Sequence, residues 1–66
     1  MAQTIFLDFD ERGRAYVSED TFMGYLEQYA VEGDYTREKD DVVYYYNSAG
    51  CNLAEYHRKE GYGIFI

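Results

Sequence analysis

The run VVYYY at residues 42–46 constrains the fold of this chain more than any other feature. Its two β-branched and three aromatic residues favour a strand, although the preceding TREKDD could begin a helix. A chain of 66 residues makes one domain and buries only roughly 60% of its unfolded surface, so the core is thin. Nine tyrosines and four phenylalanines supply large contact areas that offset the small size. We therefore expect a single folded domain over residues 1–66 that contains a β-sheet.

Further strands are predicted at both ends of the chain. Residues 4–9 alternate weakly in hydrophobicity, which suits a strand with one buried face. Gly13 then marks a turn, and residues 15–17 return as a short second strand. The final YGIFI, residues 62–66, is too apolar to be left free and is expected to pair with the sheet.

The main helix is predicted over residues 19–31. Ser18 is a good N-cap, two acidic residues follow it at the positive end of the helix dipole, and Gly33 lies just beyond the predicted C-terminus. Four residues at helical spacing form the face that is expected to pack on the sheet, namely Phe22, Leu26, Tyr29 and Ala30.

The segment NLAEYHRKEG, residues 52–61, has two interpretations. Asn52 and Glu55 resemble a capping box and Gly61 can end a helix, which favours a short helix over residues 53–60. The competing interpretation makes the segment a strand in a hairpin with residues 42–46. With the helix preferred, the predicted fold class is α+β, a small, mostly antiparallel sheet packed by one main helix and a short second helix.

The charge of the chain is strongly negative. Thirteen acidic residues against six basic ones give a formal charge of −7, which argues against direct binding to nucleic acid or to a membrane and favours a basic protein partner. The acids are dispersed in small clusters, so they are predicted to lie on several parts of the folded surface. The alternative is that this charge only keeps a tyrosine-rich protein in solution.

The stretch FDERGRAYVSEDTF, residues 9–22, has part of the spacing of an EF-hand loop. Calcium needs about six to eight oxygen ligands. With Asp10 as the first ligand, Arg12 and Arg14 occupy the next two ligand positions, and with Asp8 first, Arg12 still occupies the fifth. We therefore predict a turn and a capped helix without a metal, and a degenerate EF-hand-like module without calcium stays as an alternative.

The sequence contains no catalytic signature. His57 and Cys51, the only histidine and the only thiol, would be rotated roughly 240° from one another on a helix and would not form a dyad. The chain has no glycine-rich phosphate loop and no nucleophile elbow. We therefore predict that the protein is not an enzyme and needs no cofactor.

The expected location is intracellular. A single cysteine fits a reducing compartment. The sequence also lacks a secretory signal and an apolar run of about 18 residues. These features predict a soluble protein without a membrane span.

In size, acidity and dispersed carboxylates, the chain resembles the small phage-encoded inhibitors of bacterial defence, namely anti-CRISPR proteins and the anti-restriction DNA mimics. The resemblance implies a cytoplasmic protein of a bacterial host that binds a CRISPR effector or a restriction enzyme where DNA would sit. The alternative is a small adaptor or regulatory domain that binds a basic protein surface unrelated to nucleic acid. A homodimer through residues 42–46 also stays open.

Under the mimicry hypothesis, carboxylates imitate nucleic-acid phosphates and tyrosines supply anchor contacts. Roughly two in three of the tyrosines are expected to pack on the sheet or the helix instead. The residues predicted to contact the partner are Asp8, Asp10, Glu11, Glu19, Asp20, Glu27, Glu32, Asp34, Glu38, Asp40, Asp41, Tyr25, Tyr35 and Tyr45.

Overall fold

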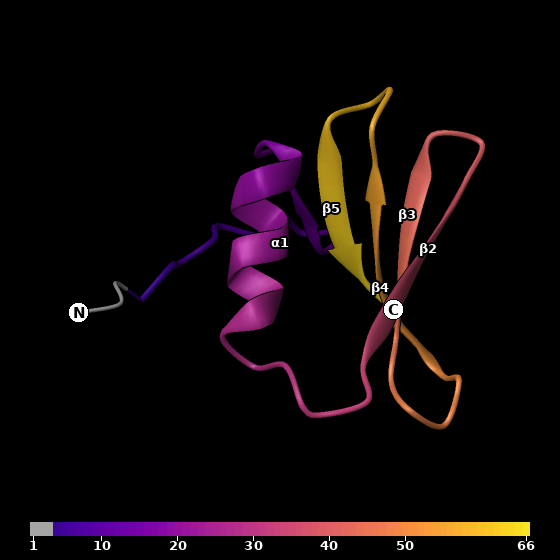
Figure 1. Cartoon of the computed structure of the whole chain (residues 1–66). Coiled ribbons are helices and arrows are strands. Elements are labelled where there is room, and N and C mark those ends of the chain that lie inside the picture. Colours follow the sequence, from indigo (N-terminus) through magenta and orange to yellow (C-terminus); the bar gives the residue numbers. More distant parts are fainter. Residues whose placement is uncertain (1–3) are drawn as a thin grey trace.

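A computed structural model describes residues 4–66 as one helix packed on one face of a five-stranded antiparallel sheet (Figure 1). The predicted α+β fold class is confirmed. The strand order across the sheet is β1-β5-β4-β3-β2. The elements are β1 (Arg14–Ala15), α1 (Glu19–Glu27), β2 (Tyr35–Lys39), β3 (Val42–Tyr46), β4 (Asn52–His57) and β5 (Tyr62–Phe65).

Residues 4–9 do not form the predicted strand. Instead, the side-chain amide of Gln28, just after α1, bonds to both backbone groups of Ile5. The Ile5 N–H donates to the amide oxygen of Gln28, and the amide nitrogen of Gln28 donates to the Ile5 carbonyl at 3.0 Å. The backbone is thus held to the helix by a side chain rather than by a neighbouring strand. β1 is correspondingly short, covering residues 14–15 rather than 15–17.

The segment after residue 51 is a strand, so the preferred prediction of a helix over residues 53–60 is wrong and the competing hairpin is right. β4 pairs with β3 on one side and β5 on the other. A bulge in the pairing with β3 lies between Asn52 and Ala54. The Asn52 side chain donates to the Glu55 carboxylate at 3.0 Å. The pair that resembled a helix cap is therefore a contact within a strand.

β2 was not predicted at all. All five of its residues are exposed, and it is an edge strand that pairs only with β3. Asp40 and Asp41 connect the two strands and both have positive φ angles, 53° and 63°. Two such residues form the tight hairpin turn that matches the twist of paired strands, and aspartate is among the residues that tolerate it.

The helix begins where it was predicted and ends earlier. The Ser18 side chain accepts a hydrogen bond from the Thr21 N–H at 3.2 Å, which caps the first turn. α1 ends at Glu27, so Tyr29 and Ala30 lie beyond it and are exposed. Phe22 and Leu26 are buried against the sheet as predicted. Only the first half of the predicted helix face therefore packs on the sheet.

The core centres on Phe22, whose side chain is fully buried. Its ring lies directly on Gly63 of β5, where an added Cβ would come within 2.3 Å of two ring atoms. The rings of Phe22 and Tyr56 lie 5.8 Å apart, and the Tyr56 hydroxyl donates to the Val17 carbonyl at 2.6 Å. The remaining buried residues of this core cluster are Leu26, Val43, Tyr45 and Ala54.

Arg58, in the turn between β4 and β5, joins three parts of the chain. Its Nε lies 2.6 Å from a carboxylate oxygen of Glu19 at the start of α1, and its Nη2 lies 2.7 Å from one of Glu38 in β2. Hydrogen bonds from the guanidinium lower the pKa of both carboxyl groups below their ordinary value of 4.5. The fork geometry of arginine suits this two-carboxylate bridge.

Replacing Arg58 by glutamine is expected to lower the melting temperature by a few degrees at neutral pH. Because the folded-state pKa values of Glu19 and Glu38 lie below 4.5, the contribution of the bridge is complete above that pH and is lost as the pH falls through the folded-state values. Melting curves followed by circular dichroism should therefore converge for the two proteins in acid. Lys59→Gln, which removes a looser 3.6 Å contact to Asp41, is the matched control. A gap between Arg58→Gln and wild type that persists undiminished at about pH 2.5 would contradict the assignment.

Candidate functional site

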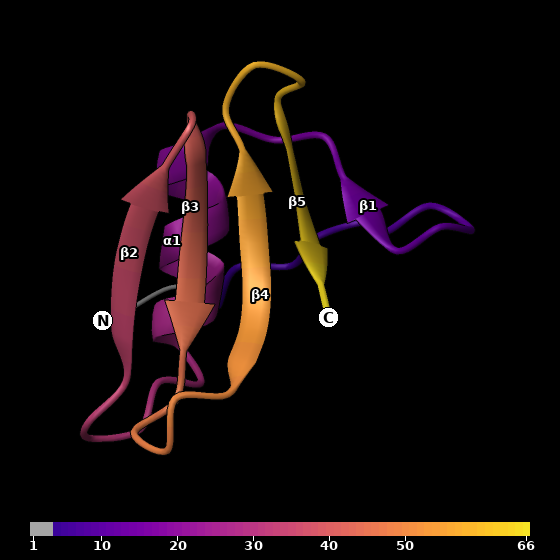
Figure 2. The same cartoon turned by 90° about the vertical axis from the view of Figure 1, so that its right-hand side faces the viewer.

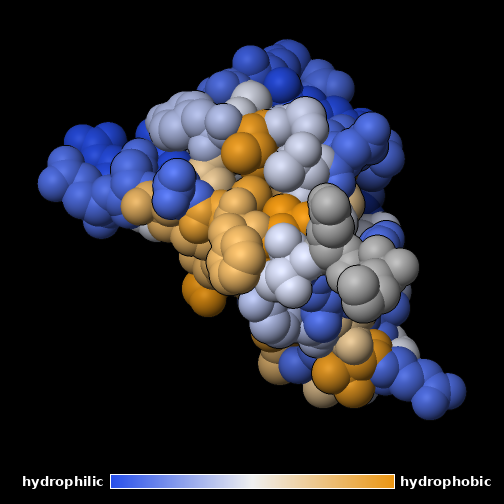
Figure 3. All heavy atoms as spheres, turned by 90° about the vertical axis from the view of Figure 1, so that its left-hand side faces the viewer, coloured by the Kyte–Doolittle hydropathy of each residue, from blue (hydrophilic) through white to orange (hydrophobic). Residues whose placement is uncertain are grey.

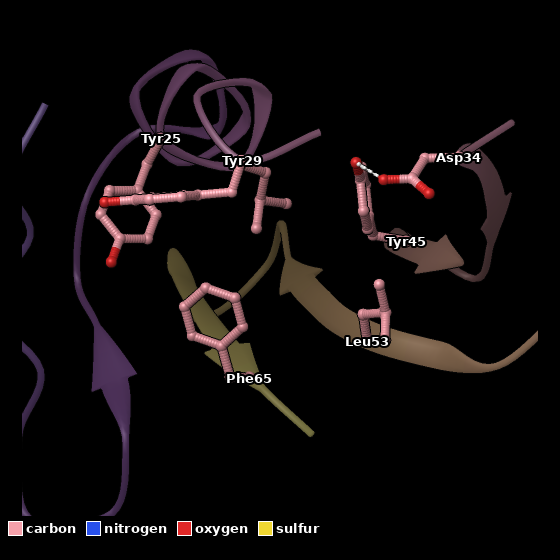
Figure 4. Close-up of a pocket in the computed structure, with 7 residues that line it drawn as sticks. Tyr25, Tyr29, Asp34, Tyr45, Leu53 and Phe65 are labelled. Carbon is pink, nitrogen blue, oxygen red and sulfur yellow. Dashed lines mark hydrogen bonds between the residues drawn. The ribbon is translucent and has the colours of Figure 1, made fainter. Parts of the chain in front are cut away.

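A pocket of about 340 Å³ opens between the end of α1 and the three inner strands of the sheet, β3, β4 and β5 (Figure 4). Figure 4 shows side chains from α1, from the segment before β2, and from β3, β4 and β5 around one open space. Most of the wall is aromatic or aliphatic, and a single carboxylate enters it. The lining residues are Tyr25, Leu26, Tyr29, Asp34, Tyr45, Leu53 and Phe65.

The aromatic wall of the pocket is built by contacts between rings. The Tyr25 ring lies 5.4 Å from that of Tyr29 and 5.9 Å from that of Phe65, both in edge-to-face geometry. The ring of Phe9, from the N-terminal segment, also packs on this wall. Its centroid lies 6.0 Å from that of Tyr25 and 5.5 Å from that of Phe65. Tyr29 remains 64% exposed, so its ring has free surface for a ligand.

The polar end of the pocket is a hydrogen-bonded pair. The Tyr45 hydroxyl donates to an oxygen of Asp34 at 2.7 Å, and the same oxygen accepts from the Val31 N–H at 3.0 Å. These bonds lower the pKa of Asp34, so its carboxylate is charged at neutral pH. The pKa of Tyr45 is raised to about 12. Burial of the phenol is the largest cause, and the hydrogen bond to Asp34 and the negative charge of Asp34 add to it. The pocket therefore holds a fixed negative charge and a neutral phenol.

Two further carboxylates belong to residues that are close in sequence to lining residues, and we call Glu27 and Glu32 the acidic rim. Glu27 ends α1 beside the lining residue Leu26, and its charge contributes to the raised pKa of Tyr45. Glu32 precedes Asp34 by two residues, and both rim side chains belong to exposed residues. On the helix side of the molecule, hydrophobic side chains gather in the middle of the surface, and strongly hydrophilic ones lie above them (Figure 3).

The structure brings together three of the predicted contact residues, since Tyr25, Asp34 and Tyr45 all line the pocket. Tyr45 is buried, as expected for most tyrosines, whereas Tyr35 lies on a different surface, on edge strand β2. Leu53 and Phe65 were not predicted as site residues. Leu53 lies in the segment for which a helix was preferred, and no sequence signal grouped it with the other lining residues.

Several predicted contact carboxylates already bind groups within the protein. Glu19 and Glu38 bind Arg58, Asp41 lies near Lys59, and Asp10 accepts from the backbone N–H groups of Arg12 and Arg14. Asp34 accepts the two hydrogen bonds described above, and the remaining predicted carboxylates have no ion pair or side-chain hydrogen bond within residues 4–66. They are Asp8, Glu11, Asp20, Glu27, Glu32 and Asp40.

The EF-hand-like stretch forms a turn in which Asp10 supplies the hydrogen-bond acceptors. Its Oδ1 accepts from two backbone N–H groups at 2.8 and 2.9 Å, and its backbone N–H donates to the Arg14 carbonyl. The bonds from the Arg14 and Arg12 N–H groups lower the pKa of the Asp10 carboxyl group. Across residues 4–66, no three His, Cys, Asp or Glu side chains come together as a possible metal-binding group.

Comparisons with known proteins add no assignment: no protein-family model, no curated protein and no solved structure matches this chain. In the part of the chain that the structure describes, no helix has both the length and the hydrophobicity needed to cross a membrane.

Proposed function

We propose that the protein is an acidic inhibitor that binds a nucleic-acid-processing complex of bacterial defence, a CRISPR effector or a restriction enzyme, and keeps DNA out of its groove. The observation that carries this proposal is the aromatic pocket with Asp34 inside it and the acidic rim beside it. DNA-binding grooves are rich in arginine and lysine, which are the side chains that such a pocket suits.

The expected anchor from the partner is one long basic side chain. Its aliphatic stem would lie against the rings of Tyr25, Tyr29 and Phe65, as such stems do on apolar surfaces. Its cationic head would reach the Asp34 carboxylate and the face of an exposed tyrosine, combining a charge-assisted hydrogen bond with a cation–π contact. An aromatic-lined, partly desolvated pocket is the kind of place where interface energy concentrates.

A second candidate function, a small adaptor that binds a basic protein surface unrelated to nucleic acid, is favoured by a different observation. Glu19, Glu38 and Asp41 are paired with cations of the same chain, so they do not extend a row of free negative charge. A DNA mimic relies on such a row, whereas an adaptor needs only a local acidic site. Competition with DNA separates the two functions.

The proposed inhibitor is expected to reduce binding of duplex DNA to at least one purified host restriction enzyme or CRISPR effector. Reversing the rim with Glu27→Lys and Glu32→Lys should weaken this inhibition at least about tenfold, because charge repulsion then opposes a basic anchor. Both positions are exposed, so the melting curve should change little. The measurement is an electrophoretic or anisotropy assay of duplex binding against inhibitor concentration.

The matched control is Asp8→Lys with Glu11→Lys, which makes the same change in total charge at two exposed positions that do not line the pocket. A much smaller loss of inhibition is expected for it. Equal losses in the two variants would show that only total charge matters and would reject the pocket as the anchor. Binding of protein and duplex DNA to the same partner without competition would reject the inhibitor and support the adaptor.

A further inference from the structure

The face of the sheet opposite α1 is the open face. Figure 2 looks onto it, with α1 behind the strands. Because side chains alternate along a strand, and Val43 and Tyr45 are buried in the core, Tyr44 and Tyr46 project to the open face. The pairing of β3 with β2 places Tyr35 beside Tyr46 on the same face.

Aromatic rings lie side by side across the open face. The Tyr35 and Tyr46 rings stack with centroids 5.3 Å apart, and Tyr44 follows Tyr46 at 6.4 Å. A second group lies toward the other edge, where the rings of Tyr62 and His57 stack at 4.8 Å. Five aromatic side chains from four strands are thus presented together, and none of the five is fully buried.

The residues that the five strands contribute to the open face carry a net positive charge, opposite in sign to that of the whole chain. Register places Arg37 opposite Tyr44 and Lys39 opposite Val42, so both cations share this face on edge strand β2. Arg14, on edge strand β1, lies 4.7 Å from the centroid of the Tyr62 ring. The only carboxylate that the five strands contribute to this face is Glu55, opposite Tyr44 in β4. Cations therefore flank the rings at both edges of the sheet.

We propose that the open face binds single-stranded nucleic acid. Unpaired bases stack on aromatic side chains, and phosphates pair with arginine and lysine, so rings between flanking cations fit both parts of such a ligand. A duplex hides its bases in its own stack and could use only the cations. An acidic protein segment could likewise pair with the arginine and lysine side chains, but it would give the aromatic rings no specific partner.

The formal charge of −7 does not act at full strength on this face. The molecule measures 35 × 28 × 20 Å, and charges beyond about 8 Å are largely screened at physiological ionic strength. The rim residue Glu27 ends α1, which lies on the opposite side of the sheet from the open face. Two functions can therefore occupy opposite faces: a basic protein on the helix side and a single strand on the sheet.

The test uses the isolated protein and fluorescence anisotropy with a labelled oligothymidylate of about 20 nucleotides at low salt. Saturable binding is expected, and the same length of duplex should bind at least about tenfold more weakly. Tyr44→Ala with Tyr46→Ala should weaken single-strand binding at least about tenfold. Arg37→Glu with Lys39→Glu, at exposed positions that keep the fold, should weaken it and flatten its dependence on salt.

Tyr29→Ala removes an exposed ring from the helix side and is the matched control, expected to bind like wild type. Circular dichroism verifies that each variant is folded. If neither the oligothymidylate nor a single-stranded RNA binds at low salt, the proposal is overturned. A protein partner is then the expected ligand of the open face. Unchanged binding by the Arg37→Glu, Lys39→Glu variant also overturns it. No defence complex is present in the assay, so its outcome is independent of the proposed inhibition.

Discussion

The variant Gly63→Ala is expected to be largely unfolded at room temperature. An added Cβ would lie 2.3–2.5 Å from three atoms of the Phe22 ring, far inside van der Waals contact. Gly63 is buried in β5 between its partners Ala15 and Tyr56, so the strand cannot move away without breaking two pairings. We expect a loss of more than about 3 kcal/mol, which exceeds most of what a core this small supplies. Far-UV circular dichroism and a urea titration measure it.

A control for the glycine substitution is Gly24→Ala in α1. There the added Cβ would meet only the tip of the Ile5 side chain, and alanine favours a helix by about 0.8–1.0 kcal/mol over glycine. A neutral or slightly stabilising effect is expected. Adding Phe22→Leu to Gly63→Ala should recover part of the lost stability, because it removes the ring that clashes. If Gly63→Ala melts like wild type, the packing of Phe22 on β5 has been assigned incorrectly.

Replacing Phe22 by alanine is expected to cost about 3–5 kcal/mol of unfolding free energy. Phe22 is the largest fully buried side chain, and alanine in its place removes the whole ring from the core. Leu26→Ala, at the next turn of α1, should cost about 2–5 kcal/mol. Urea unfolding followed by circular dichroism gives both values, and either variant is expected to approach the limit of folding.

Tyr29→Ala is the matched control for these two core variants. Tyr29 lies on the same predicted helix face, but it follows the end of α1 and is 64% exposed. Its truncation should change the stability by less than about 0.5 kcal/mol. A loss at Tyr29 as large as that at Phe22 would mean that the helix packs along its whole predicted length.

Local signals predicted the parts of the fold that depend on local chemistry. As predicted, Ser18 caps the start of the helix and VVYYY forms a strand. The C-terminal YGIFI forms a strand in all but its last residue. β2 has no such signal, because an exposed edge strand gains its structure from pairing with β3 and not from a buried face. Residues 4–9 do have the weak alternation, but they do not pair with a strand, and Gln28 takes both backbone hydrogen bonds of Ile5.

The candidate site was predictable only in part. Asp34 and Tyr45 could be selected as acid and tyrosine, but their hydrogen bond depends on the path of the chain between α1 and β2, which no motif determines. Leu53 reaches the pocket through a strand with a bulge in its pairing, in the segment whose helix-cap residues gave the stronger local signal. The grouping of rings and cations on the open face could not be predicted without the strand register, because these residues come from segments far apart in the sequence.

The edge position of β2 has a consequence for the behaviour of the protein in concentrated solution. VVYYY combines high β-propensity with no charge, which is the composition of segments that assemble into fibrils when an edge is exposed. In the fold, β3 lies between β2 and β4, so both of its edges are paired. The outer strand carries Arg37, Glu38 and Lys39, and charged side chains on an edge discourage pairing with another molecule. The charged edge strand β2 thus shields the most aggregation-prone segment of the chain, and we expect solubility to depend on β2 staying paired with β3.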